Sequence, residues 1–129
     1  MRLSKWLAAG GFALLAGALA GPVTARQQEP PPDPKLVADG KKVFTGKGMC
    51  ISCHGADGKG TPLAPNLTDA EWLNVDGTMA SIIGLVKTGV TKPKKHPAPM
   101  PAMGGASLKD DEVRAVAAYV WTLSHPPAK

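Results

Sequence analysis

Two cysteines and a histidine lie close together in the stretch Cys50-Ile51-Ser52-Cys53-His54. Two thiols at this spacing, with an imidazole directly after the second, form the pattern to which haem is covalently attached. Each thiol adds across one vinyl group of the porphyrin, and the imidazole binds the iron beneath the ring. The pattern therefore predicts one covalently bound c-type haem, with Cys50 and Cys53 as its attachment points and His54 as an iron ligand.

The cysteine pair also permits other interpretations. A redox-active dithiol uses the same spacing, but it normally lies in a βαβ pattern, and the sequence has no alternating strand pattern. A structural zinc site needs a second pair of ligands, and Cys50 and Cys53 are the only cysteines. An incidental match to a short pattern is the remaining alternative.

The first 25 residues have the features of a secretory signal. Arg2 and Lys5 give a basic start, 15 mostly apolar residues follow from Trp6 to Ala20, and Val23-Thr24-Ala25 matches a cleavage site. An uncleaved membrane anchor is the alternative, but its apolar stretch is shorter than the roughly 20 residues that cross a bilayer. We therefore expect export to the periplasm and a mature chain that begins at Arg26.

The mature chain is expected to form one small domain. Residues 26–34 are polar and proline-rich, which is typical of an extended spacer, and the domain covers 35–125, followed by a tail at 126–129. Loss of Arg2 and Lys5 leaves 13 basic residues against 10 acidic ones, which is too small an excess to indicate a nucleic-acid partner. Only four aromatic residues remain, so a buried porphyrin would complete an otherwise thin core.

The hydrophobic pattern predicts an all-α protein with a long helix at each end of the domain. The first helix is expected to begin at Pro34, with Asp33 as its N-cap. The last is expected to begin near Lys109 or Asp110 and to end before Pro126. Their predicted buried faces are Leu36, Val37, Gly40, Val43 and Phe44 in the first helix, and Val113, Val116, Ala117 and Val120 in the last.

Two shorter helices are expected between these. The stretch Thr68-Asp69-Ala70-Glu71 has the spacing of a capping box and predicts a short helix through Trp72. Thr78 is expected to cap a further helix that Gly89 ends. The apolar positions of that helix are Met79, Ile82, Ile83 and Val86.

The order of these features resembles that of class I cytochromes c. The resemblance covers about residues 34–124, and it implies a cytochrome c fold with three to five helices wrapped around one covalently bound haem. Residues 64–73 are also similar to the haem domains in the di-haem subunit of cbb-type oxidases, although this chain has a single haem motif. The resemblance rests on Gly40 and Phe44, the CxxCH motif, Pro65-Asn66-Leu67, Met100-Pro101 and Ala118-Tyr119-Val120.

The resemblance also implies roles for individual residues. Gly40 and Phe44 would cross the last helix against Val116 and Tyr119. The Pro65 carbonyl would accept the Nδ1 hydrogen of His54, and Met100 would bind the iron from the opposite side. The complete set of expected haem-binding residues is Cys50, Cys53, His54, Pro65, Leu67 and Met100.

Several other residues are candidates for the second axial ligand. Met100 lies between Pro99 and Pro101, which restrict its backbone. From the residues alone Met103 is an equal candidate, and the resemblance favours Met100. Packing explains Met49, beside a haem-linked cysteine, and Met79, on a helix stripe. His96 is better explained as an exposed loop residue.

These features favour an exported carrier of single electrons between respiratory or dehydrogenase partners, and not an enzyme. The alternatives are a haem subunit of a larger oxidase or dehydrogenase, and a gas-binding or peroxidase-like protein with a weak or absent sixth ligand. Contact with a membrane is expected only through an uncleaved N-terminal segment or a membrane complex. A lysine cluster either guides an acidic redox partner or keeps a loop soluble; it consists of Lys87, Lys92, Lys94 and Lys95.

Overall fold

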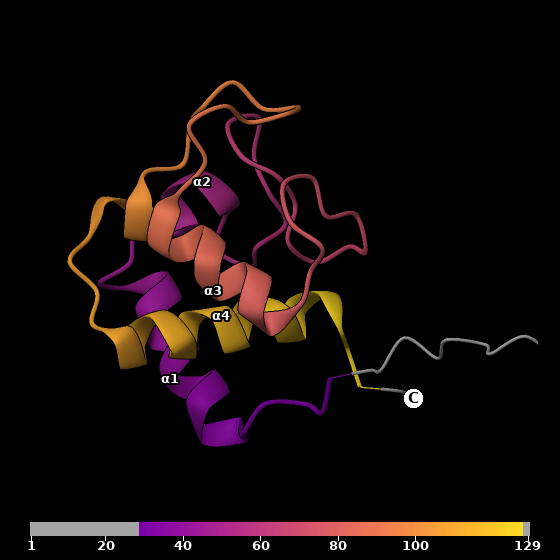
Figure 1. The fold of residues 1–129 in the computed structure, drawn as a ribbon, viewed down its shortest axis with the longest axis vertical. Helices are drawn as coiled ribbons and strands as arrows, with labels where there is room; N and C mark the ends of the chain where they lie inside the picture. Colours follow the sequence, from indigo (N-terminus) through magenta and orange to yellow (C-terminus); the bar gives the residue numbers. More distant parts are fainter. Residues whose placement is uncertain (1–28, 128–129) are drawn as a thin grey trace, which may run out of the picture.

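The computed structural model describes residues 29–127, so the predicted signal peptide and residues 26–28 and 128–129 lie outside the described part. The described chain is helical (Figure 1). Within it no strand forms, one antiparallel bridge joins Val90 to Met100, and no helix has the length and apolar character needed to cross a membrane. The elements are α1 (Pro34–Thr45), α2 (Ile51–His54), α3 (Met79–Thr88), the 3-10 turn η1 (Ala102–Gly105) and α4 (Asp110–Ser124).

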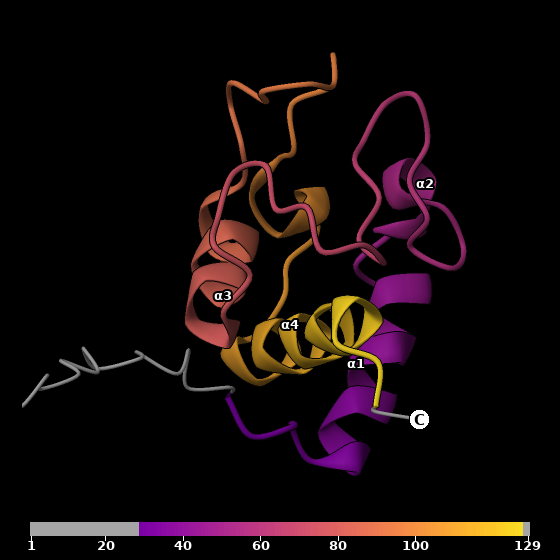
Figure 2. The ribbon, with the colours of Figure 1, turned by 90° about the vertical axis from the view of Figure 1, so that its right-hand side faces the viewer.

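The crossing of α1 and α4 is the main helix contact of the fold (Figure 2). Gly40 permits this crossing, because a Cβ atom at its position would overlap the carbonyl oxygen of Ala115. One turn later Phe44 is almost completely buried, and its ring meets that of Tyr119 edge-on with centroids 5.3 Å apart. The contact of Phe44 with Tyr119 was predicted, whereas the backbone that Gly40 approaches belongs to Ala115.

Helix α1 begins, and α3 begins and ends, where the sequence predicts. The Asp33 carboxylate accepts hydrogen bonds from the first free amides of α1, and Pro34 occupies the first helical position. The Thr78 hydroxyl accepts a 3.2 Å hydrogen bond from the Ser81 amide at the start of α3. Gly89 follows the last residue of α3 with a φ of 71°, a conformation that glycine adopts without strain.

The start of α4 compensates for the absence of a serine or threonine N-cap. Lys109 takes the N-cap position, and its amide donates a 2.8 Å hydrogen bond to the Glu112 carboxylate. The same carboxylate forms an ion pair with the Lys47 ammonium group at 2.7 Å, which connects the turn after α1 to the start of α4. Backbone and side-chain contacts together therefore fix this end of α4.

The prediction of a short helix through Trp72 is wrong. The Thr68 amide and hydroxyl both donate to Asn66 Oδ1, at 2.8 and 2.7 Å, and the Glu71 amide donates to Asp69 Oδ1 at 3.0 Å. These side-chain acceptors satisfy the amides in successive turns, and so they compete with the helix that the capping-box spacing suggests.

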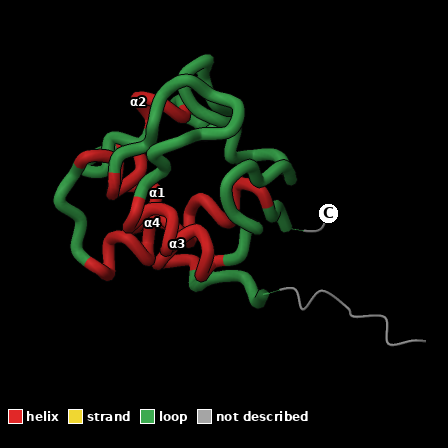
Figure 3. The backbone as a smooth tube through the Cα atoms, turned by 45° about the horizontal axis from the view of Figure 1, so that its top comes forward, coloured by secondary structure: helices red, strands yellow, loops and turns green. Residues whose placement is uncertain are grey.

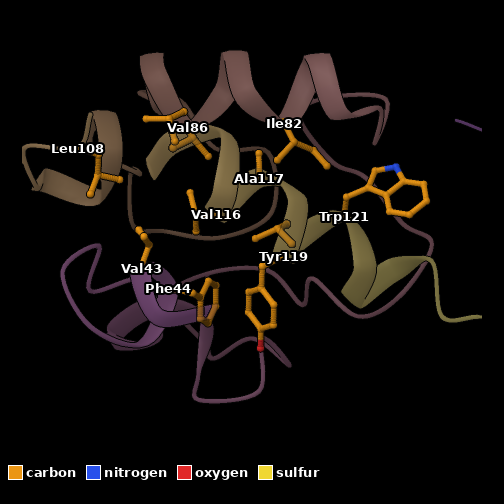
Figure 4. Packing of buried hydrophobic residues seen from close by; sticks show 11 residues of the cluster. Val43, Phe44, Ile82, Val86, Leu108, Val116, Ala117, Tyr119 and Trp121 are labelled. Atoms are coloured by element: carbon orange, nitrogen blue, oxygen red, sulfur yellow. The ribbon is translucent and has the colours of Figure 1, made fainter. Parts of the chain in front are cut away.

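The apolar faces of α1, α3 and α4 form one core (Figure 4). The predicted stripe of α3 contributes Ile82 and Val86, which are buried, while Met79 and Ile83 are partly buried against the same core. All four predicted core positions of α4 are buried. Figure 3 shows these three helices gathered on one side, with α2 and the long loops making up the other.

Candidate haem-binding site

A cavity of about 240 Å³ lies between the helical side and the loop side of the molecule. Helices and loops far apart in the sequence supply its walls, and most of the side chains are apolar. Such walls fit a flat apolar ring such as a porphyrin. The thiols and the imidazole that also line the cavity fit the attachment of that ring and the binding of its iron. Wall residues of the helices include Phe44 of α1, Ile82, Leu85 and Val86 of α3, and Val116 and Val120 of α4.

Cys50, Cys53 and His54 all line this cavity. The motif forms a single helical turn, in which positions i, i+3 and i+4 share one face. Gly55 ends the turn with a φ of 79°. The spacing read from the sequence therefore brings both thiols and the imidazole to one wall of one cavity, which is the arrangement that two-point attachment of a porphyrin requires.

His54 is held in a defined orientation. Only 9% of the residue is exposed, and its Nδ1 atom lies 3.0 Å from the carbonyl oxygen of Pro65. Burial lowers the pKa of the His54 imidazole, and this effect outweighs the opposite influence of the Pro65 carbonyl. Burial thus favours the neutral ring. In the tautomer that donates its Nδ1 hydrogen to the Pro65 carbonyl, the Nε2 lone pair is left for a metal ion.

The loop that carries Pro65 is tied back to α2. The Gly60 amide donates to the His54 carbonyl at 2.7 Å, and the Thr61 hydroxyl donates to the Cys53 carbonyl at 2.6 Å. Further along, the Leu67 amide donates to the Gly58 carbonyl at 2.7 Å, and Leu67 itself lines the cavity. These bonds explain how a residue 11 positions after the histidine returns to meet it.

The two thiols are partly buried. Burial raises the pKa of the Cys50 thiol above its ordinary value. Thiol–disulfide exchange proceeds through the thiolate, so this environment disfavours the chemistry of a redox-active dithiol. The described residues also form no strand, so the βαβ pattern in which a redox-active dithiol normally lies does not surround this pair.

Met100 and Met103 both line the cavity, and both are partly buried against the core. The Met100 backbone is fixed, because its amide and carbonyl exchange hydrogen bonds of 2.9 and 2.8 Å with Val90. Met49 also reaches the cavity, but it is 64% exposed. Met79 packs against the core and does not line the cavity.

The remaining candidates lie outside the main cavity. His96 lines a neighbouring cleft, and its Nδ1 atom lies 3.4 Å from the Pro62 carbonyl. In the lysine cluster, Lys87 pairs with Asp110 at 2.8 Å and Lys95 pairs with Glu71. Among the described residues the other two lysines make no ion pair.

Comparison with known proteins identifies relatives of this chain. The model of the family described as cytochrome c matches residues 37–124. The chain is 42% identical over 98 residues to the cbb3-type cytochrome c oxidase subunit FixP of Rhizobium meliloti (strain 1021), covering 72% of this chain and 29% of that protein. It is 37% identical over 95 residues to the subunit CcoP of Rubrivivax gelatinosus, covering 74% of this chain and 28% of the relative. The chain thus spans less than a third of the length of either relative.

A solved structure shows the same fold. One chain of a reducing HAO-like protein complex of Kuenenia stuttgartiensis superposes with a TM-score of 0.55 at 23% identity. The superposition covers 74% of this chain and 48% of that chain. The arrangement of helices and loops described above is therefore one that a solved protein also adopts.

Proposed function

The chain belongs to the cytochrome c family and carries covalently bound haem c, and from this premise we propose that it transfers single electrons with His54 and Met100 as the two axial ligands of the iron. Bound haem c supplies the couple between ferric and ferrous iron. The observation that carries the proposal is that an oriented imidazole and a thioether on a fixed backbone line one apolar cavity.

His54 provides the first ligand. The Pro65 carbonyl accepts the Nδ1 hydrogen at 3.0 Å, which leaves Nε2 free and strengthens it as an electron donor. Because the loop carrying Pro65 is itself bonded to α2, the imidazole keeps one orientation in both oxidation states.

Met100 provides the second ligand. The bridge to Val90 and the prolines on either side restrict its backbone, so that the thioether is presented from a rigid segment. Two neutral ligands on rigid elements allow an electron to arrive or leave with little rearrangement. The apolar walls limit the access of water, which favours the less charged, ferrous state.

Carbon monoxide binding tests this proposal. Carbon monoxide needs an open or weakly held position on ferrous iron, so native protein should bind it slowly and incompletely. Rapid and complete uptake by the native ferrous protein would instead support the gas-binding or peroxidase-like interpretation. The visible spectrum of the same samples reports whether the iron has six ligands in both oxidation states.

A second candidate function is that of a subunit in a larger oxidase, because FixP and CcoP are themselves oxidase subunits. In either role we propose that the domain works in the periplasm, with redox proteins as its partners. Extraction of the native protein with mild detergent distinguishes the two roles. A free carrier elutes alone at its own mass, whereas a subunit elutes with oxidase chains. Intact mass then shows whether the chain begins at Arg26 and carries one haem.

A further inference from the structure

We propose that Met103 is a second thioether ligand that can take the place of Met100 on the haem iron, an inference that rests on the proposed ligation by Met100. Both methionines line the cavity, and both are partly buried against the core. Met49, which also reaches the cavity, is 64% exposed, so solvent competes for its side chain. Two thioethers three positions apart are thus held within the cavity wall.

The backbone of Met103 supports this role. Its φ of 56° and ψ of 25° lie in the left-handed region, which a residue with a side chain seldom adopts. Such strained conformations persist where surrounding contacts impose them, and they gather at ligand-holding positions. Glycine would adopt the same conformation freely, as Gly104 and Gly105 do in this turn. Met49 has a similar φ of 52° and also lines the cavity, but it is 64% exposed. The strained backbone of Met103 together with its packing against the core therefore points to a use for its side chain.

Neighbouring contacts hold the turn in place. The Gly104 amide donates a 3.0 Å hydrogen bond to the Pro101 carbonyl, and the Ala106 amide donates a 3.2 Å bond to the Met103 carbonyl. The backbones of Gly104 and Gly48 are in close contact, because a Cβ atom at Gly104 would lie 2.6 Å from the Gly48 carbonyl oxygen. The turn η1 is thereby docked beside the haem-attachment turn, and Met103 stays at the cavity when Met100 is absent.

The exchange is chemically simple. The bond between iron and the Met100 sulfur breaks, and a bond between iron and the Met103 sulfur forms. Both side chains are neutral thioethers, so neither a proton nor an electron moves. The Met103 side chain has three rotatable bonds, so it can move while the turn and the bridge between Val90 and Met100 remain in place.

The test compares three holoprotein variants, Met100→Ala, Met103→Ala and the double variant, with Met100→Ala/Met49→Ala as the matched control. The readouts are the sulfur-to-iron charge-transfer absorption of the ferric protein, the shifted methionine methyl signal of the ferrous protein in NMR, and the carbon monoxide association rate. Met100→Leu replaces Met100→Ala throughout if the alanine variant does not fold.

We expect Met103→Ala to keep the sulfur-to-iron absorption, because Met100 still provides the thioether. Met100→Ala should keep a sulfur signal that the double variant loses. If Met103 occupies the iron in about nine-tenths of molecules, carbon monoxide binds Met100→Ala about tenfold more slowly than the double variant. The Met49 control should behave like Met100→Ala.

Two results overturn the proposal, and they are distinguishable. If Met100→Ala and the double variant have the same spectra and the same association rate, Met103 is not a ligand, while ligation by Met100 stands. If Met103→Ala loses the sulfur signal and Met100→Ala keeps it in full, the assignment of Met100 in the proposed function also fails.

Discussion

Glu29 and Met79 lie 50 positions apart, and the Glu29 carboxylate accepts a 2.8 Å hydrogen bond from the Met79 amide. Met79 is the first residue of α3, so its amide has no partner within the helix. The segment before α1 thus supplies a cap to the helix that forms one wall of the haem cavity. Residues 29–33, the part of the predicted 26–34 spacer that is described and precedes α1, are in this way attached to the domain.

Removal of this cap should destabilise the protein. Replacing Glu29 with Ala leaves the Met79 amide without its acceptor and removes a negative charge from the positive end of α3, at a cost of about 0.5–2 kcal/mol in unfolding free energy. Chemical denaturation of the holoprotein measures this cost. Glu29→Gln keeps an acceptor oxygen and should lose less; equal stability of Glu29→Ala and the native protein would show that the contact contributes nothing.

Gly40 and Gly84 provide a matched pair of helix glycines. A Cβ atom at Gly40 would overlap the Ala115 backbone, whereas a Cβ atom at Gly84 would meet no atom within 4 Å. We expect Gly40→Ala to separate α1 from α4 and to cost about 1–3 kcal/mol or more. Gly84→Ala should be neutral or stabilising by up to about 1 kcal/mol, because alanine favours the helix. Thermal unfolding of both variants checks the difference, and similar melting temperatures would contradict this account of the crossing.

The long helices were predictable because their signals are local. Asp33 with Pro34 marks the start of α1, and Thr78 and Gly89 delimit α3. The apolar spacing matches the buried side of each helix, although Leu36 and Val37 of α1 are only half-buried. The same local logic fails after Asn66, because the Asn66 side chain captures the amide and hydroxyl of Thr68. A capping-box spacing does not reveal a competing acceptor two residues upstream.

The spacing of residue types in the sequence does not predict contacts between residues that lie far apart in the chain. Nothing in the spacing indicates that Glu29 reaches Met79, or that Lys95 pairs with Glu71. The CxxCH motif locates the thiols and the imidazole because they share one helical turn. The return of Pro65 to His54 depends on hydrogen bonds across a loop, and only the family resemblance suggested it.

Asp76 should make stability depend on acid pH. The nearby Ser81 hydroxyl and the hydrogen bonds from the Thr78 amide and hydroxyl, at 3.0 and 2.8 Å, lower the pKa of Asp76 to about 2. A carboxylate with a lowered folded-state pKa stabilises the protein above its unfolded-state pKa, and this contribution fades as the pH falls from about 4 towards 2.

Asp76→Asn tests this expectation. The variant should unfold at lower denaturant concentration than the native protein at pH 6, and the two midpoints should converge as the pH approaches 2. A constant difference between the midpoints over this range would show that ionisation of Asp76 is not the cause.

Lys92 and Lys94 are the members of the lysine cluster suited to guide an acidic partner. Both are exposed, both flank Pro93, which lines the haem cavity, and neither makes an ion pair within residues 29–127. Lys87 and Lys95 are already neutralised by Asp110 and Glu71. An acidic redox protein that docks over this loop would therefore be attracted chiefly by two charges close to the cavity.

Replacing Lys92 and Lys94 with Gln should slow electron transfer from an acidic partner by about three- to tenfold at low salt and should flatten its dependence on ionic strength. Stopped-flow measurement of the second-order rate at several salt concentrations provides the test. The control is Lys35→Gln/Lys41→Gln, which removes the same formal charge from α1, at the opposite end of the molecule from the 91–97 loop (Figure 1). Lys35 pairs with Asp39, so this control tests the net charge of the protein and not the loss of two unpaired lysines. If both pairs of substitutions slow the reaction equally, net charge governs association and the loop guides nothing. If neither pair changes the rate, the two lysines act only to keep the loop soluble.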